Sequence, residues 1–121
     1  RLVHIRKATI ELKNILPRES YILDPGGQSI DSQWFVNANY WHPTKKNVIN
    51  SKIEYLILNE GYPGSLKREG VSLKDSSKSE EYQEKIKFWK ALTNNGLEGQ
   101  FQVTREFKEA RFTLFRRVPI D

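Results

Sequence analysis

Residues 82–119, YQEKIKFWKALTNNGLEGQFQVTREFKEARFTLFRRVP, decide the fold of this chain. Their first half predicts an amphipathic helix, because apolar residues recur on one face at Tyr82, Ile86, Trp89 and Leu92. Asn95-Gly96 should end this helix, since both residue types tolerate a positive φ. The second half predicts a β-hairpin. Alternation places Phe101, Val103 and Phe107 on one face of its first strand, and Phe112 and Leu114 begin the second.

Two strands and another helix are expected upstream. Residues 2–16 predict a helix, with Ile5, Ala8, Leu12 and Ile15 on one face and Pro17 as its stop. Residues 20–24 predict a short buried strand. Residues 53–58 form a nearly continuous apolar run, which is typical of a strand that is covered on both faces.

Two further segments carry weaker patterns. Within residues 28–43, Ile30, Trp34 and Ala38 are spaced by four, which favours a helical segment. Residues 60–78 contain three glycines, one proline and four serines, and we predict an exposed loop there. Ser77 and Glu80 have the spacing of a capping box and should open the helix that follows.

The order of these elements indicates one α/β domain. Two strands that are separated by long segments with helical character predict a parallel pair, and the terminal hairpin should extend the sheet in antiparallel fashion. We therefore expect a small mixed sheet of four or more strands with flanking helices and a C-terminal antiparallel hairpin. A chain of 121 residues has the size of a single domain.

Composition excludes several classes of function. Cysteine is absent, which rules out disulfides, thiolate zinc sites and a cysteine nucleophile. The net charge of +5, from 20 basic and 15 acidic residues, permits contact with an anionic surface without demanding it. No apolar run approaches the ~18 residues that a membrane span needs. The chain begins at Arg1 and contains no methionine, so we expect it to be part of a longer protein.

The best candidate for a ligand site lies behind the ends of the two predicted parallel strands. Open α/β sheets place ligands at the carboxyl ends of their strands. A glycine-rich turn and an aromatic cluster follow the first strand, and a tyrosine follows the second. The candidate ligand-binding residues are Asp24, Gly26, Gly27, Trp34, Tyr40, Trp41 and Tyr62. The turn lacks the full G-x-G-x-x-G spacing, and Pro25 removes a backbone donor, so we expect no cofactor.

Other chemistry finds little support in the residues. His4 and His42 are far apart and have no cysteine partner, so we expect no metal. No G-x-S-x-G elbow is present, and we assign no catalytic residue. The hairpin carries four arginines among its phenylalanines, which is the composition of a nucleic-acid-binding sheet: Arg105, Arg111, Arg116 and Arg117. A solvated edge strand explains them more simply, so nucleic acid is not the expected partner.

Four stretches resemble the soluble domain that follows the last span of polytopic membrane glycosyltransferases. The resemblance is to enzymes that take sugar from polyprenyl phosphates, of the aminoarabinose-transferase-like and protein-mannosyltransferase-like kinds. The matching stretches are residues 16–24 (LPRESYILD), 54–59 (EYLILN) with Tyr62, 88–92 (FWKAL) and 115–119 (FRRVP). The polar stretch 64–78 and the aromatic cluster 34–41 depart from the pattern.

This resemblance implies a non-catalytic domain on the extracytoplasmic face of a membrane. Its partner would be the membrane-spanning part of the parent protein, where that family keeps its catalytic carboxylates. A saccharide or a lipid-linked sugar is the ligand that it implies. Two alternatives stay open, namely an independent nucleotide- or cofactor-binding protein that uses residues 24–27, and a nucleic-acid-binding module that uses the basic hairpin.

Overall fold

The structure is a computed structural model that describes residues 2–24, 33–38, 43–59 and 76–119. Helix α1 spans Leu2–Ile15, strand β1 Tyr21–Leu23, β2 Val36–Asn37, helix α2 Lys45–Ile49 and β3 Tyr55–Asn59. Helix α4 (Ser76–Gly99) and strands β4 (Phe101–Phe107) and β5 (Phe112–Arg117) complete the described elements. The predicted first helix, both upstream strands, the aromatic helix and the terminal hairpin are confirmed.

One mixed sheet organises the chain, in the order β2-β1-β3-β5-β4. Strand β1 runs parallel to both β2 and β3, and the hairpin β4–β5 joins in antiparallel fashion through β5. The expected fold class is therefore confirmed. The hairpin folds back so that β5, the last strand, pairs with β3, and β4 becomes the outer strand on that side.

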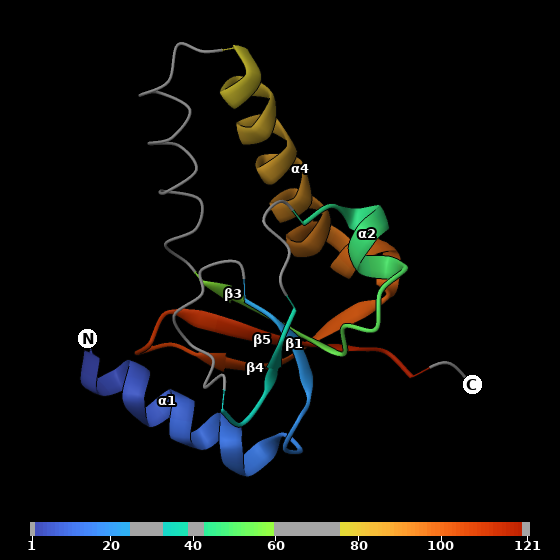
Figure 1. The fold of residues 1–121 in the computed structure, drawn as a ribbon. Coiled ribbons are helices and arrows are strands. Elements are labelled where there is room, and N and C mark those ends of the chain that lie inside the picture. The colour runs from blue at the N-terminus through green and yellow to red at the C-terminus, as the bar shows by residue number, and fades with distance from the viewer. Residues whose placement is uncertain (1, 25–32, 39–42, 60–75, 120–121) are drawn as a thin grey trace.

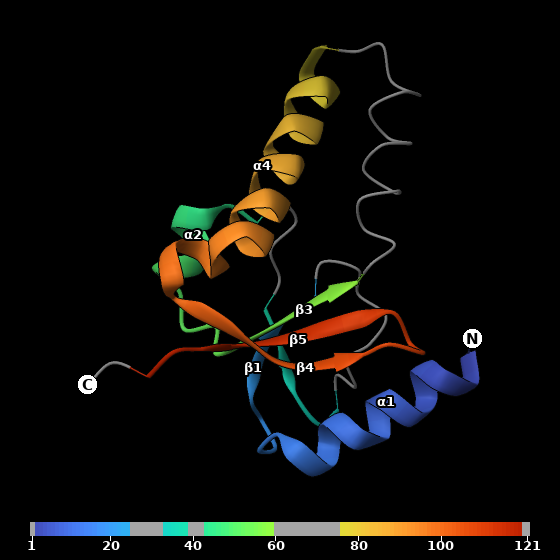
Figure 2. The same cartoon turned by 180° about the vertical axis from the view of Figure 1, so that it is seen from behind.

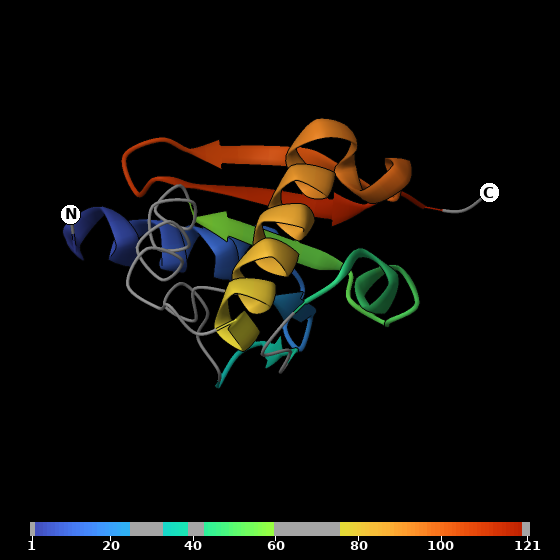
Figure 3. The same cartoon turned by 90° about the horizontal axis from the view of Figure 1, so that it is seen from above.

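The helices cover opposite faces of the sheet (Figures 1 and 2). Helix α1 lies along one face, and α2 and α4 lie on the other. Figure 3 shows α4 crossing over β3 and β5. None of the helices in the described ranges combines the length and the hydropathy that a membrane span requires.

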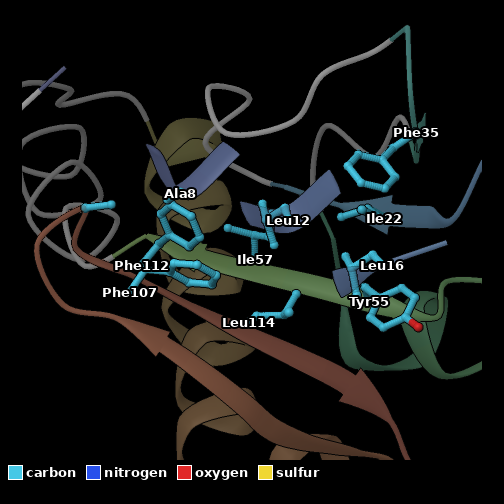
Figure 4. Packing of buried hydrophobic residues seen from close by; sticks show 11 residues of the cluster. Ala8, Leu12, Leu16, Ile22, Phe35, Tyr55, Ile57, Phe107, Phe112 and Leu114 are labelled. Atoms are coloured by element: carbon cyan, nitrogen blue, oxygen red, sulfur yellow. The ribbon is translucent and has the colours of Figure 1, made fainter. Parts of the chain in front are cut away.

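Each face of the sheet has its own hydrophobic core. Strand β3 serves both, because its successive side chains point to opposite faces. Tyr55 and Ile57 pack under α1 with Leu12, whereas Leu56 and Leu58 pack in the α4-side core. Figure 4 shows the α1-side core, in which Phe107 and Phe112 lie together with their ring centroids 4.7 Å apart. The expectation that residues 53–58 are covered on both faces is thus confirmed.

Two segments differ from their predicted structure. In the helical segment expected over 28–43, residues 33–35 form a turn and Val36–Asn37 form β2, so that part of the prediction was wrong. Trp34 lies in the turn and packs against the α1-side core, whereas Ala38 follows β2 and is buried in the α4-side core. The predicted loop 60–78 lies outside the described residues except for 76–78, which already belong to α4.

The face of α4 that packs on the sheet is rotated from the expected one. Phe88 is 2% exposed and Leu92 is 1% exposed, and both belong to the α4-side core. Trp89, which helical spacing placed on the predicted apolar face with Leu92, lies half-buried at the margin of this core. Helical spacing relative to Leu92 is compatible with burial of either Phe88 or Trp89. In the structure it is Phe88 that joins Phe101 and Phe115 in the α4-side core.

A β-bulge in β4 corrects the predicted alternation of the hairpin. Val103 pairs with Phe115 and Arg105 pairs with Leu114, which leaves Thr104 as an extra residue. The extra residue reverses the alternation, so Phe101 joins the α4-side core and Phe107 joins the α1-side core. The prediction that Phe101, Val103 and Phe107 share one face was therefore wrong.

The C-terminal end of α4 is confirmed at the predicted place. Asn95 leaves helical geometry at φ −144°, and Gly96, Leu97 and Glu98 follow with positive φ. The Asn95 side-chain oxygen accepts a hydrogen bond from the Glu98 backbone N–H at 3.1 Å, which stabilises the turn. Leu97 is fully buried in this left-handed turn and anchors it to the α4-side core.

Candidate functional site

Two polar residues lie at the carboxyl ends of the parallel strands β1 and β3. Asp24 follows β1 directly and is only 7% exposed, and Asn59 is the last residue of β3. Both already have interaction partners within the protein. Asp24 is thus a buried residue at the edge of the sheet where the sequence placed the candidate site.

Trp34 lies at the opposite end of the same strands. Trp34 stands two residues before Val36, the register partner of Tyr21, while Asp24 stands three residues after Tyr21. Counted through this register, Trp34 and Asp24 are offset by five positions along the strands. The structure does not bring Trp34 and Asp24 together.

Two cations lie over the Trp34 ring. The Arg18 guanidinium is 4.7 Å and the Lys13 ammonium 5.7 Å from the ring centroid. These contacts attract each cation to the negative face of the indole. A ligand that stacks where either cation lies would have to displace it. The remaining predicted site residues, Gly26, Gly27, Tyr40, Trp41 and Tyr62, lie outside the described residues, and so does His42.

The terminal hairpin offers no aromatic platform to nucleic acid. Its phenylalanines are all buried in the two cores: Phe101, Phe107, Phe112 and Phe115. Base stacking needs exposed rings, so these four cannot provide it. Arg105 forms an ion pair with Glu11 of α1 and lies 5.1 Å from the Phe107 centroid, which makes it a contact between helix and sheet.

Arg117 has a structural role that the sequence patterns did not predict. Its guanidinium donates hydrogen bonds to the carbonyl oxygens of Ile53 at 2.8 Å and Val48 at 2.9 Å, with longer contacts to Ile49 and Ser51. It also lies 4.7 Å from the centroid of Phe101. The only available signal was its place in the FRRVP stretch.

Burial affects the ionisation of this group. Burial lowers the pKa of the Arg117 guanidinium from its usual value, and the Glu54 carboxylate partly opposes that shift. A guanidinium stays charged at neutral pH even so. Arg117 therefore remains a cationic donor that joins the end of α2 to β5.

An open groove lies between α1 and the turn of the hairpin. It has a volume of about 380 Å³, an apolar floor that includes Ala8 and Phe107, and a charged rim of both signs. His4 Nδ1 lies 3.1 Å from Glu109 Oε2, and both residues line the groove. None of the residues that line it carries a hydroxyl or a thiol, so it lacks a side-chain nucleophile for group transfer.

A second, smaller hollow lies between α2 and α4. It measures about 240 Å³, and its floor includes Phe88 and Ala91. Three lysines and Glu84 surround it, and one of the lysines, Lys45, is paired with Glu98 at 2.9 Å. Within the described ranges, no three His, Asp or Glu side chains are placed to hold a metal ion together.

Comparison with known proteins yields one fold relationship. No protein-family model matches this chain, and no curated protein matches its sequence. Among solved structures, the chain is similar to the C-terminal globular domain of an oligosaccharyltransferase from Archaeoglobus fulgidus, with a TM-score of 0.52. The two share a fold. The likeness covers 93% of this chain and 95% of the other at 11% sequence identity.

Proposed function

We propose that this chain is a non-catalytic accessory domain of a membrane glycosyltransferase-like protein, on the extracytoplasmic side of the membrane. The observation that carries the proposal is the fold likeness, which extends over nearly the whole of both chains and therefore concerns a complete domain. The four sequence stretches that resemble such domains support it independently.

The packing supports a structural reading of those four stretches. Residues 16–24 contain β1, and residues 54–59 contain β3, the strand that serves both cores. Phe88 and Leu92 bury α4 on the sheet, and Arg117 ties β5 to the end of α2. A domain of this kind would retain these residues for its fold, while the chemistry resides in the membrane part of the parent protein.

The side of the membrane can be tested by cysteine labelling of the natural, full-length protein. Because this domain has no cysteine, a single one can be introduced at Lys90, an exposed position on α4. After removal of any cysteines elsewhere, a membrane-impermeant maleimide should label Lys90→Cys on intact cells. Leu92→Cys, at a buried position two residues away, is the matched control and should react only after denaturation.

Labelling of Lys90→Cys only after lysis would contradict the extracytoplasmic placement. A natural protein without membrane spans would contradict the proposal as a whole. In either case the alternative of an independent cofactor-binding protein would gain weight.

The ligand class can be tested by titration of the domain while amide NMR shifts are followed. We expect weak saccharide binding, with a dissociation constant on the order of millimolar, because stacking on one or two aromatic rings without a deep pocket offsets little of the ordering cost of binding. Shifts should map near Trp34 or Trp41. Shifts at residues 24–27 on addition of a nucleotide or S-adenosylmethionine, with none from sugars, would support the cofactor-binding alternative instead.

The isolated domain should show no glycosyltransferase, hydrolase or methyltransferase activity. The groove beside α1 has no hydroxyl or thiol in its lining, and in the hollow between α2 and α4 the Thr44 hydroxyl caps α2 by accepting a hydrogen bond from the Asn47 N–H. The residues of the candidate turn lack a complete phosphate-binding pattern. Turnover by the purified domain in any of these assays would contradict the non-catalytic role.

A further inference from the structure

The outer face of α1 combines exposed apolar side chains with basic ones. Val3 and Ile10 are each 60% exposed. They are seven residues apart, which is two helical turns, so they lie on one line along the helix. Ala8 and Leu12 are buried on the opposite side of α1. This helix therefore has a second apolar stripe that the fold does not cover.

Apolar exposure is concentrated on this helix. In the described part of the chain, five large apolar side chains are highly exposed, and three of them belong to α1: Val3 and Ile10 lie on the outer line, whereas Ile15 lies two turns from Ala8 at the margin of the buried side. The other two are Val36 and Val103, one on each of two different strands. Single exposed apolar residues are ordinary, so the pair Val3 and Ile10 gains meaning only from the charges beside it.

The charges that flank the stripe have one sign. Arg6 and Lys7 are exposed and lie between Val3 and Ile10 along the helix, one on each side of the line that joins them. Neither forms an ion pair within the described residues. The single acidic residue of α1, Glu11, is engaged by Arg105 of β4 and does not neutralise this face.

We propose that the outer face of α1 docks on an anionic lipid surface. An apolar stripe with basic flanks is the pattern of a helix that lies in the plane of a membrane interface, with its apolar side chains among the acyl chains and its cations at the headgroups. A second copy of the chain fits this face less well, because a symmetric contact would bring Arg6 and Lys7 of both copies together. The inference extends the proposed function by naming the face that meets the membrane.

The test uses the purified domain and co-sedimentation with vesicles. Wild type should bind vesicles that contain the anionic lipid phosphatidylglycerol, should release them at high salt, and should bind pure phosphatidylcholine weakly. Arg6→Gln with Lys7→Gln should lower the partition coefficient roughly fivefold per charge, or about 25-fold together. Lys87→Gln with Lys90→Gln on α4 is the matched control, with an equal loss of charge on the other side of the molecule and little expected effect.

Insertion of the apolar stripe into the lipid can be measured directly by fluorescence. The absence of cysteine allows a single environment-sensitive NBD label at Ile10→Cys or, as a control of similar exposure, at Val103→Cys. Emission from position 10 should shift to the blue with anionic vesicles, and emission from position 103 should stay unchanged. The same labelled proteins, measured without lipid over a range of concentrations, reveal self-association through position 10.

Three results would overturn docking on lipid. They are equal binding to both kinds of vesicle, an equal loss of binding in the α1 and α4 charge variants, and a blue shift at position 10 that follows protein concentration without lipid. Failure here, together with extracytoplasmic labelling of Lys90→Cys, would reject only the docking face. Vesicle binding together with cytoplasmic labelling would reject only the accessory-domain proposal.

Discussion

Arg117 holds together parts of the chain that are far apart in sequence. Its side chain donates hydrogen bonds to the carbonyl oxygens of Val48 at the end of α2 and of Ile53 before β3. Its backbone N–H donates a hydrogen bond to the Glu54 carbonyl oxygen at 2.7 Å. A planar guanidinium can reach several carbonyls at once with fixed geometry, which an ammonium cannot. The role of this residue is therefore specific to arginine.

Arg117→Lys should lower the free energy of unfolding by about 1.5–3 kcal/mol, because charge-assisted hydrogen bonds to buried carbonyls are lost. Arg116→Lys makes the same change at the exposed neighbouring position and should stay within about 0.5 kcal/mol of wild type. Urea denaturation measures both. Equal effects at the two positions would show that the bonds of Arg117 contribute nothing specific.

Phe88 and Trp89 are neighbours on α4 with different roles. Phe88→Ala should cost about 3–5 kcal/mol, because it leaves a cavity between α4 and the sheet. Trp89→Ala should cost only about 1–2 kcal/mol, since Trp89 is half-buried. The comparison by chemical denaturation is direct, and a larger loss for Trp89→Ala would mean that the helix presents its other face to the core.

At the scale of elements, the turn after α4 determines how the helix leads into β4. Gly96 has φ +63° and a methyl group there would overlap the Phe101 carbonyl oxygen, whereas Gly99 has φ +76° and open space around it. Both positions demand left-handed backbone, and only the first also demands the absence of a side chain.

Gly99→Ala should therefore cost about 1–2 kcal/mol, the strain of left-handed backbone alone. Gly96→Ala should cost more, ~3 kcal/mol or above, because the backbone of β4 must also move. Thermal and urea unfolding of the two variants provide the measurement. Equal losses of stability in the two variants would show that Gly96 does not approach the backbone of β4 as closely as the structure indicates.

At the scale of the whole molecule, the sheet couples its two faces. Strands β3 and β5 each contribute side chains to both cores, so neither core persists once the sheet separates. We expect one cooperative unfolding transition. Leu12→Ala on the α1 side and Leu92→Ala on the α4 side should each lower the stability of that transition by about 2–5 kcal/mol.

Trp34 and Trp89 report the two faces separately, because they pack at the margins of the α1-side and α4-side cores. With Trp41 replaced by phenylalanine, variants that keep only Trp34 or only Trp89 should show fluorescence transitions at the same urea concentration. Transitions that separate would indicate that one face unfolds before the other.

The sequence by itself determined the elements whose signals are local. Helical spacing in residues 2–16, the apolar run 53–58, the Asn95-Gly96 stop and the hairpin after it all depend on neighbours within a few positions. These predictions were confirmed, and with them the mixed α/β class. For the candidate ligand site, the sequence indicated only that its residues follow the ends of the two parallel strands.

Only the tertiary structure decided how those elements meet. In the structure, β5 lies between β3 and β4, and Phe88 is buried in the core while Trp89 lies at its margin. The extra residue Thr104 places Phe101 and Phe107 on opposite faces of the sheet. The tertiary structure also separates Trp34 from Asp24 along the strands. The physical reason is that periodicity encodes which side chains share a face, whereas strand order, register and the choice of face follow from contacts between residues far apart in the chain.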